Sequence, residues 1–469
     1  MTEIPLSVRA AAAAMRAGDL TSVELTEACL ARADAHDAEL GSYLLRFDEH
    51  ALASAAAADA DLAAGVDHGP MQGIPIGMKD ILAMSEGPTT GNSLVLDPAW
   101  GADKDGPVVR RLKDSGSVIT GKVTTMEFAI GMPDFDKPFP IPRNPWDTST
   151  WPGGSSSGTG NGIAAGFFLA GIGTDTGGSI RIPAAFCGVS GLMPTFGRVP
   201  KSGCVPLGFT LDHIGPLART AWDCGAMLQV LAGYDPSDPN CVDRPVPDFL
   251  DGVDDGIAGM RIGVMREHHF VEAHDGTEAA FDAAVAQLEA LGAEVVELSI
   301  PYYAEVAAAA MVTMCGEAAA YHRNDLQSRW GDYFAQTRAI VSWGTLASAA
   351  DYVQAQRVRR VGQQALAEVF AGVDVIATPT SSVGSPTFES VEGGIMEVFG
   401  SIHTTYWDAV GNPALVVPMG FTDAGLPVSL QLAASPFAEA TLVRTGNAFQ
   451  SATDWHVRVP ELVAAAAAL

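Results

Sequence analysis

The uneven distribution of glycine, proline, serine and threonine is the feature that most restricts the fold of this chain. Residues 66–216 are dense in these four types and carry only short apolar runs, such as the Ser-Val-Ile-Thr-Gly stretch at 117–121. Residues 1–65 are instead rich in alanine, a strong helix former. Short apolar runs between glycine-rich segments predict a buried sheet with long functional loops, preceded by a helical segment.

Strand-like and helical patterns alternate in the second half of the chain. Strands are expected at 260–265, 293–299, 373–379 and 414–420. Helices are expected at 277–292, 303–322, 345–371 and 436–451. In the first of these helices Thr277 is the expected cap, and Phe281, Val285 and Leu288 recur at helical spacing. This alternation predicts an α/β fold, a single large domain with a central mixed twisted β-sheet flanked by α-helices.

Charge and cysteine content exclude several classes of function. The 27 basic and 55 acidic residues give a net charge of −28, which repels nucleic acid and anionic membrane surfaces. No apolar run approaches the roughly 18 residues of a membrane span, and the N-terminus lacks the pattern of a signal peptide. The six cysteines form no CxxC pair, and no metal-ligand spacing is present. We therefore expect a soluble, cytoplasmic protein without cofactor or metal.

A first motif, Gly-Ile-Pro-Ile-Gly-Met-Lys-Asp-Ile-Leu at 73–82, places a lysine inside an apolar run. Lys79 is one of only six lysines in the chain. A lysine at a strand end commonly extends its ammonium group to solvent. Burial would instead disfavour the ammonium form and lower the pKa from about 10.4 toward neutrality, which produces a base. Both interpretations are open at this point.

A second motif, Trp-Pro-Gly-Gly-Ser-Ser-Ser-Gly-Thr-Gly-Asn-Gly at 151–162, sets three serines between glycines. Ser156 matches the centre of a G-x-S-x-G elbow, but no apolar strand precedes it, as such an elbow requires. A flexible loop is the plain alternative. No histidine lies near these serines, so the local sequence does not indicate a Ser-His-Asp triad.

A third motif, Gly-Thr-Asp-Thr-Gly-Gly-Ser-Ile-Arg-Ile-Pro at 173–183, places two glycines before Ser179. Consecutive backbone N–H groups beside a Gly-Gly pair can form a concavity that binds an oxyanion. A turn whose serine caps a helix is the alternative.

Together the three motifs resemble the amidase signature family. Its pattern is a lysine in a Gly-Ile-Pro-x-x-x-Lys-Asp context, then Gly-Gly-Ser-Ser, then a second serine 24 residues after the first, as Ser155 and Ser179 are here. The resemblance covers most of the chain and is weakest over 236–400. One departure is Ser157, where the family pattern has glycine.

The resemblance implies an amidase that hydrolyses a C–N amide bond through a Ser–cis-Ser–Lys triad and an acyl-enzyme. Ser179 would be the nucleophile, Ser155 the bridging serine after a cis Gly154–Ser155 bond, and Lys79 the base. Ser156 would support them. The backbone oxyanion hole would fall at Thr176, Gly177, Gly178 and Ser179. Four further charged residues are expected to form buried ion pairs that hold the loops: Asp175, Arg181, Asp212 and Arg219.

By the same resemblance the chain divides into four stretches. These are an N-terminal helical segment at 1–65, a catalytic core with the signature motifs at 66–235, a helical and strand region at 236–400, and a C-terminal part at 401–469 that completes the core sheet. The segment at 233–249, rich in proline and aspartate, is the best linker candidate.

The substrate is less constrained by the motifs. Six aromatic and apolar residues near the motifs either belong to the core or line a pocket for an acyl or aryl group: Phe128, Ile130, Met132, Trp151, Phe209 and Trp407. The expected partner is a small-molecule amide, such as an aryl amide, or a carbamate, with no nucleic acid and no membrane, and a homodimer is left open. Two alternatives remain: the A-type component of an amidotransferase, which would use glutamine within a complex, and a non-catalytic scaffold of the same fold.

Overall fold

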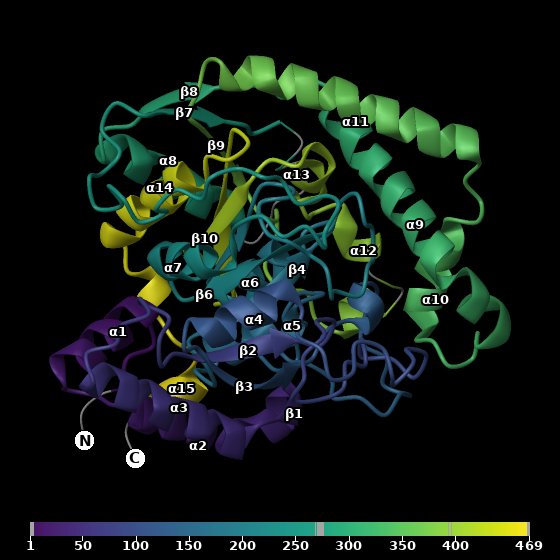
Figure 1. Cartoon of the computed structure of the whole chain (residues 1–469). Coiled ribbons are helices and arrows are strands. Elements are labelled where there is room, and N and C mark those ends of the chain that lie inside the picture. The colour runs from purple at the N-terminus through teal and green to yellow at the C-terminus, as the bar shows by residue number, and fades with distance from the viewer. Residues whose placement is uncertain (1–3, 268, 270–275, 393, 395, 467–469) are drawn as a thin grey trace.

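One mixed sheet organises the molecule (Figure 1). The computed structural model describes residues 4–267, 269, 276–392, 394 and 396–466. Within these ranges an 11-stranded sheet has the order β1-β3-β2-β4-β6-β5-β10-β11-β9-β7-β8. Strand β2 pairs in parallel with β3 and β4, and β7 with β8 and β9, whereas the other neighbours are antiparallel. The predicted α/β fold with a central mixed sheet is therefore confirmed.

The strands are short and mostly buried. They are β1 (Tyr43–Arg46), β2 (Pro75–Lys79), β3 (Val118–Val123), β4 (Ala170–Asp175), β5 (Ser190–Met193), β6 (His213–Ala218), β7 (Arg261–Val264), β8 (Glu294–Glu297), β9 (Val375–Pro379), β10 (Ala414–Phe421) and β11 (Pro427–Ala434). The four strands expected in the second half correspond to β7, β8, β9 and β10.

The helices of the described ranges include the four that the second half of the sequence predicts, at 277–292, 303–322, 345–371 and 436–451. They are α1 (Val8–Ala17), α2 (Ser22–Leu40), α3 (Asp48–Ala63), α4 (Pro107–Asp114), α5 (Ser157–Ala164), α6 (Arg181–Cys187), α7 (Ala221–Leu231), α8 (Thr277–Ala290), α9 (Tyr303–Ser328), α10 (Ala335–Trp343), α11 (Ala349–Phe370), α12 (Met396–Phe399), α13 (Thr405–Val410), α14 (Glu439–Ser451) and α15 (Glu461–Ala466). The expectation that Thr277 caps α8 is wrong. Gly276 holds that position with φ 85°, and Thr277 is the first helical residue.

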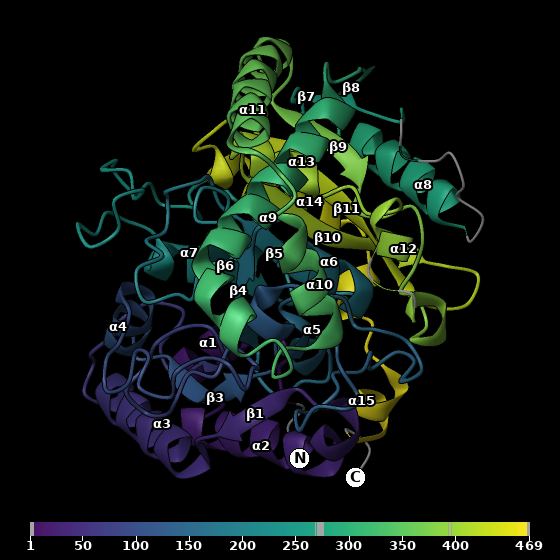
Figure 2. The ribbon, with the colours of Figure 1, turned by 90° about the vertical axis from the view of Figure 1, so that its right-hand side faces the viewer.

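Helices cover both faces of the sheet (Figure 2). Helices α7, α8 and α14 pack on one face, and α5 and α6 on the other. Strand β10 illustrates the alternation, because Leu415 and Val417 join the core cluster on the α7 and α14 side while Val416 joins the cluster around α6. Both faces are therefore buried, which explains why the strand sequences read as short continuous apolar runs.

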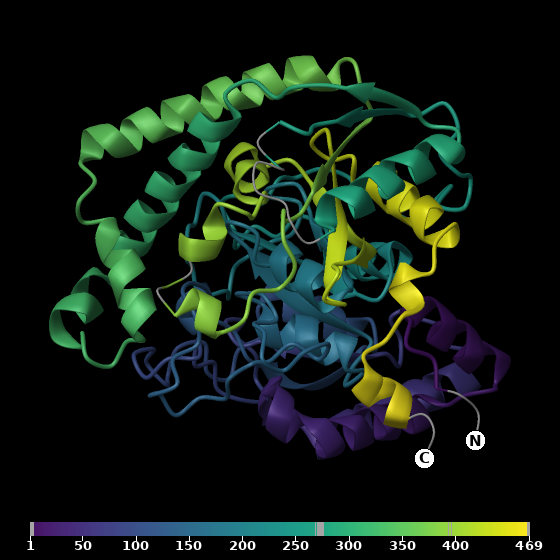
Figure 3. The same cartoon turned by 180° about the vertical axis from the view of Figure 1, so that it is seen from behind.

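Helices α9, α10 and α11 form an arm along one side of the molecule (Figures 1 and 3). All three come from the stretch where the family resemblance is weakest, and α10 had no clear signal in the sequence. Helix α9 packs against α10, α11 and α13, so the arm is fixed to the body of the protein.

All four predicted stretches contribute strands to the same sheet. Strand β1 comes from 1–65, β2 to β6 from 66–235, β7 to β9 from 236–400, and β10 and β11 from 401–469. The linker candidate at 233–249 is fully described and contains no helix or strand. No helix in the described part of the chain is long and apolar enough to cross a bilayer.

Candidate active site

The three sequence motifs meet at one edge of the sheet. Strand β2 ends at Lys79 and the parallel neighbour β4 ends at Asp175, so their carboxyl ends share an edge. Ile76 and Met78 point into the core on the α7 side. Alternation therefore directs Lys79 to the opposite face, where α5 begins after Ser156. Carboxyl edges of this kind are where open α/β sheets bind ligands.

Lys79 is enclosed by three hydroxyl groups. Its Nζ lies 2.7 Å from Ser155 Oγ, 2.9 Å from Ser156 Oγ and 2.8 Å from Thr174 Oγ1. The lysine has no solvent exposure. Ser156 donates its own proton to the carbonyl oxygen of Thr174 at 3.3 Å, so its oxygen is an acceptor toward Lys79. A neutral amine fits this cage, since it can donate two N–H bonds and accept one O–H bond.

Burial determines the charge of this lysine. It lowers the pKa of Lys79 to about 7, because removing the ammonium from water is costly, and the acidic groups Asp175 and Asp212 oppose this only in part. A substantial fraction of Lys79 is therefore neutral near neutral pH. The sequence left open whether Lys79 reaches solvent, and the structure excludes that interpretation.

The serine loop is held tightly around this lysine. The Gly154–Ser155 peptide bond is cis, as the family resemblance predicted. Ser157, the departure from the family pattern, donates from Oγ to the carbonyl oxygen of Gly153 at 2.6 Å and closes the turn that carries Ser155. The N–H of Ser156 donates to the carbonyl oxygen of Ser179 at 3.2 Å, which ties the second motif to the third.

Ser179 opens on the same pocket as Ser155. It is half-buried, whereas Lys79 is closed to solvent behind Ser155. Among the described residues no hydrogen bond joins the hydroxyls of Ser155 and Ser179. A proton transfer between them therefore requires the tightening that catalytic contacts commonly show when substrate binds.

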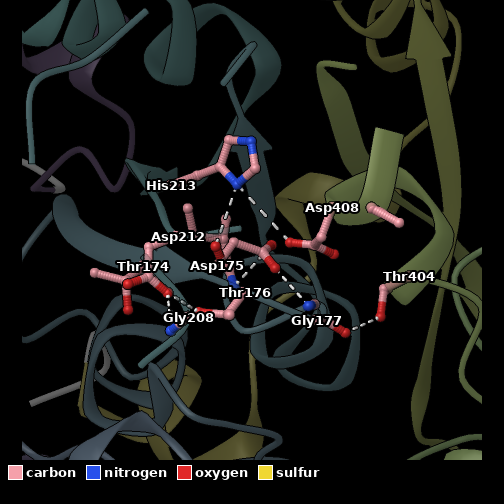
Figure 4. Close-up of polar contacts among 12 residues, drawn as sticks. Thr174, Asp175, Thr176, Gly177, Gly208, Asp212, His213, Thr404 and Asp408 are labelled. Carbon is pink, nitrogen blue, oxygen red and sulfur yellow. Dashed lines mark hydrogen bonds and ion pairs between the residues drawn. The ribbon is translucent and has the colours of Figure 1, made fainter. Parts of the chain in front are cut away.

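The backbone before Ser179 forms a nest with a fixed orientation (Figure 4). The carbonyl oxygen of Gly177 accepts from Thr404 Oγ1 at 2.7 Å and from Thr405 Oγ1 at 3.2 Å. The N–H of Gly178, on the other side of that peptide, donates to the Asp175 carboxylate. Gly178 therefore has no N–H left for a substrate, which departs from the role that the resemblance implied.

Three other N–H groups of the nest remain available. Within the described chain, no acceptor takes a hydrogen bond from the N–H of Thr176, Gly177 or Ser179. Gly178 is required in the nest for its backbone conformation and its close approach to Thr404. Its φ is +128°, and a Cβ at this position would overlap Thr404 Oγ1.

A buried charge cluster of Arg181, Asp175 and Asp408 adjoins the nest. Arg181 donates to Asp175 at 2.9 Å and to Asp408 at 2.6 Å, and all three side chains have no exposure. Burial alone would raise the pKa of Asp175, but the guanidinium of Arg181 holds it below its usual value. Burial and the neighbouring Asp175 charge raise the pKa of Asp408. The two carboxyl groups that share the Arg181 guanidinium therefore have pKa values shifted in opposite directions.

The expectation of ion pairs holds for Asp175 and Arg181 but is wrong for Asp212 and Arg219. Asp212 accepts from Thr176 Oγ1 at 2.7 Å and from two backbone N–H groups. Arg219 donates to the carbonyl oxygen of Ile163 at 3.0 Å, with no carboxylate at ion-pair distance among the described residues. Backbone groups are among the partners of both side chains, and a list of charged residues cannot reveal such partners.

His213 is the histidine nearest to the motifs downstream in the sequence, and it does not face the serines. Its Nδ1 lies 3.3 Å from the carbonyl oxygen of Asp175, on the far side of the nest (Figure 4). Burial lowers the pKa of His213 to about 3, so the ring is neutral. It supports the strand end that carries Asp175 and is not positioned as a base for Ser179.

An apolar pocket lies in front of Ser155 and Ser179. Its other lining residues are Met126, Ala129, Ile130, Gly131, Gly154, Gly177, Ile182, Leu207, Met311, Met314, Ile340 and Phe399. No charged side chain is among them within the described part of the chain. The only polar side chains that line the pocket there are the two serines.

Of the six apolar residues proposed from the sequence for a pocket, Ile130 is a lining residue. Phe128, Met132, Trp151 and Trp407 lie in core clusters, and Phe209 is on the surface. Sequence alone cannot tell which side of an irregular loop faces the core.

Several pocket residues could not be found from the motifs, because they lie far from them in the sequence. Met311 and Met314 lie on α9, and Ile340 on α10. The spacing of three between the methionines places them on one face of a helix, but nothing in the sequence says that this face meets the serines.

The sheet and the lysine–serine cluster together define an enzyme of α/β fold in the hydrolase class. A family model described as Amidase matches residues 24–443, so the chain belongs to the amidase signature family. The described residues of the site include no cluster of side chains suited to binding a metal ion, since no group of three or more histidine, cysteine or acidic side chains in the described ranges is arranged to hold one.

Curated relatives that match over nearly the whole chain include amidotransferase subunits and an amidase. The chain is 40% identical over 490 residues to a glutamyl-tRNA(Gln) amidotransferase subunit of Chloroflexus aggregans, covering 99% of this chain and 100% of that protein. It is 38% identical over 470 residues to an amidase of Pseudomonas putida, covering 98% of each. The peptide amidase structure from Stenotrophomonas maltophilia superimposes with a TM-score of 0.82 at 28% identity, covering 95% of this chain and 98% of that one.

Proposed function

We propose that the protein hydrolyses amides with an apolar acyl group, with Ser179 as nucleophile, Ser155 as proton relay and Lys79 as base. The observation that carries this proposal is the enclosed contact of 2.7 Å between Lys79 Nζ and Ser155 Oγ. An amide is a weak electrophile, so the attacking hydroxyl needs a base within reach of its proton. A lysine whose pKa lies near 7 meets that need at neutral pH.

The proposed reaction moves one proton in and out through Ser155. As Ser179 Oγ attacks the carbonyl carbon, its proton passes to Ser155 Oγ, and the Ser155 proton passes to the neutral Lys79. The resulting oxyanion accepts hydrogen bonds from the N–H groups of Thr176, Gly177 and Ser179. Collapse breaks the C–N bond, and the proton returns from Lys79 through Ser155 to the leaving nitrogen. Water then hydrolyses the ester of Ser179 by the same relay.

The pocket supports an apolar acyl group. Met311, Met314, Ile340 and Leu207 offer a substrate no hydrogen-bond donor and no acceptor stronger than a thioether sulfur. Burying a polar or charged group against such a wall is unfavourable unless it is paired. Methionine side chains adapt to irregular shapes, so the wall suits linear and aryl acyl groups alike. Carbamates form the same kind of tetrahedral oxyanion and remain candidate substrates.

Glutamine is the second candidate substrate, because the amidotransferase subunit of Chloroflexus aggregans is 40% identical to this chain. Free glutamine carries an ammonium and a carboxylate close to its amide carbonyl. Both charges would need partners in the pocket. The described lining residues supply no charged side chain, so this pocket favours the apolar amide.

The test compares hexanamide, an anilide, a phenyl carbamate and L-glutamine by release of ammonia or amine, with Ser179→Ala as the control for background. We expect the apolar amides to be cleaved with kcat/KM at least roughly 100-fold above that for glutamine, since about 3 kcal/mol separates paired from unpaired buried charge. Glutamine as the best substrate would overturn the apolar assignment and favour the amidotransferase activity.

A further inference from the structure

The apolar pocket has two walls that come from distant parts of the chain. Residues 126–131, which follow β3, form the inner wall and contribute Met126 and Ile130. The arm forms the outer wall with Met311 and Met314 on α9 and Ile340 on α10. The distance between the walls sets how well an acyl chain is enclosed. A group that joins the two walls would therefore influence substrate binding without touching the substrate.

Glu127 is such a group. Its side chain has no exposure, yet it is not among the lining residues of the pocket. Oε2 accepts from the backbone N–H of Phe334 at 2.7 Å, directly before α10 begins. Oε1 accepts from Ser93 Oγ at 2.5 Å. The carboxyl group thus connects the inner wall to the start of the helix that carries Ile340.

The inner wall itself has an unfavourable backbone conformation. Phe128 and Ala129 have φ values of 49° and 65°, in the left-handed region that non-glycine residues rarely adopt. Such a conformation persists where the surroundings determine it, and it is common at ligand-binding sites. Thr337 on α10 adds a second tie, because its Oγ1 donates to the carbonyl oxygen of Ile130 at 3.2 Å.

The burial of a carboxyl group at this position is costly. Burial raises the pKa of Glu127 to about 7, against the opposing hydrogen bonds from Ser93, Phe334 and Thr337 and the charge of Lys137. An apolar side chain would fill the same space without this cost. The favourable contribution that remains for Glu127 comes from its hydrogen bonds with Ser93, Phe334 and Thr337.

We propose that Glu127 is a positioning residue for substrate binding, which ties α10 to the inner wall and thereby holds the outer wall of the pocket against the acyl chain of the substrate. This inference rests on the proposed amide hydrolysis and adds to it the determinant of acyl-chain affinity. Long acyl chains, which reach the outer wall, depend on the tie. An acetyl group, which stays beside Ser179, depends on it much less.

The test measures kcat and KM for acetamide and hexanamide in the wild type, Glu127→Ala, Glu127→Gln and Thr337→Val. The matched control is Glu439→Ala, which removes another buried glutamate that accepts a backbone N–H, from Thr195 at 2.9 Å, on α14. Loss of the buried hydrogen bonds of Glu127 predicts a roughly tenfold higher KM for hexanamide in Glu127→Ala. The KM for acetamide and both kcat values should change less than about threefold.

The conservative variants make the result specific. Glu127→Gln keeps an oxygen that accepts from the N–H of Phe334, so it should restore most of the affinity for hexanamide. Thr337→Val keeps the shape of the side chain and removes the second tie, so it should raise the same KM in a smaller step. Glu439→Ala should lower the melting temperature and leave the ratio of the two KM values unchanged.

Equal effects on acetamide and hexanamide in Glu127→Ala, or an unchanged ratio of KM values in both Glu127→Ala and Thr337→Val, would overturn the inference. The proposed function fails by a different result, namely a wild-type protein that cleaves neither amide and whose Ser179 does not react with a fluorophosphonate. If Glu127→Ala does not fold, the Thr337→Val and Glu127→Gln measurements decide between the outcomes.

Discussion

Thr404 Oγ1 donates to the carbonyl oxygen of Gly177 at 2.7 Å, a contact that spans 227 positions of the sequence. It fixes the orientation of the peptide unit between Gly177 and Gly178, so the N–H of Gly178 points to Asp175. Of the other nest residues, Gly177 and Ser179 line the pocket. The C-terminal part of the chain therefore takes part in forming the proposed oxyanion hole.

Replacing Thr404 by valine tests this relationship. The side chain keeps its shape and loses its hydroxyl, so the peptide of Gly177 is held only by Thr405 and by the bond from the Gly178 N–H to Asp175. We expect kcat for hexanamide to fall roughly tenfold, less than the 10²–10³-fold that loss of a direct oxyanion donor costs. Thr405→Val is the control, because Thr405 lies farther away at 3.2 Å and Thr404 remains. A larger loss in Thr405→Val than in Thr404→Val would contradict the assigned roles.

Gly178 and Gly177 offer a matched pair of alanine substitutions. At Gly178 the φ of +128° and the overlap with Thr404 Oγ1 predict that alanine distorts the nest. At Gly177 a Cβ would meet only Thr405 Oγ1, at 3.8 Å. We expect Gly178→Ala to lose at least about 100-fold in kcat and Gly177→Ala to lose less than tenfold. Steady-state assays with hexanamide measure both, and similar losses would show that the nest is not the sensitive element.

The pKa of Lys79 predicts the pH dependence of the reaction. Only the neutral amine accepts the proton from Ser155, so kcat/KM should rise with pH, reach half its maximum near the pKa of about 7, and be flat above about pH 8. The sign follows from burial, which disfavours the ammonium and moves its ionisation below the free-lysine range. A rate that increases steadily to pH 10 would mean that Lys79 titrates as an ordinary surface lysine.

Substitutions at Lys79 separate base catalysis from packing. Lys79→Ala should lose roughly 10²–10⁴-fold on amides, the range for a removed general base. The loss on an activated ester should be smaller, because a good leaving group needs no proton from Ser155. Lys79→Arg should not recover amidase activity, since a guanidinium keeps its proton near neutral pH. Wild-type amidase activity in Lys79→Arg would refute the role of base.

Much of the fold was accessible from the sequence, because hydrophobic periodicity is a local signal. The spacing of Phe281, Val285 and Leu288 predicted the buried face of α8, and all three side chains are buried there. The order of the strands was not accessible. The pairing of β10 with β5, for example, joins segments more than 200 residues apart, and neither segment carries a mark of its partner.

The residues of the candidate site also divide into those that the sequence indicated and those that it did not. Lys79, Ser155 and Ser179 stand in motifs whose resemblance to the amidase signature family implied their roles. The pocket residues Met314 and Ile340 carry no such mark, because any apolar residue at a helical position reads as core. The supporting contacts of Asp212 were missed for another reason, since backbone N–H groups have no sequence signal at all.

The central claim is covalent catalysis at Ser179, and the most direct measurement is mass spectrometry of the protein after reaction with a serine-directed fluorophosphonate. We predict one label per chain, on the peptide that contains Ser179, with loss of amidase activity in proportion to labelling. Ser179→Ala should take up no label, and excess hexanamide should slow the labelling of the wild type. A label on Ser155 or Ser156 in place of Ser179, or a fully labelled protein that still cleaves hexanamide, would contradict the account.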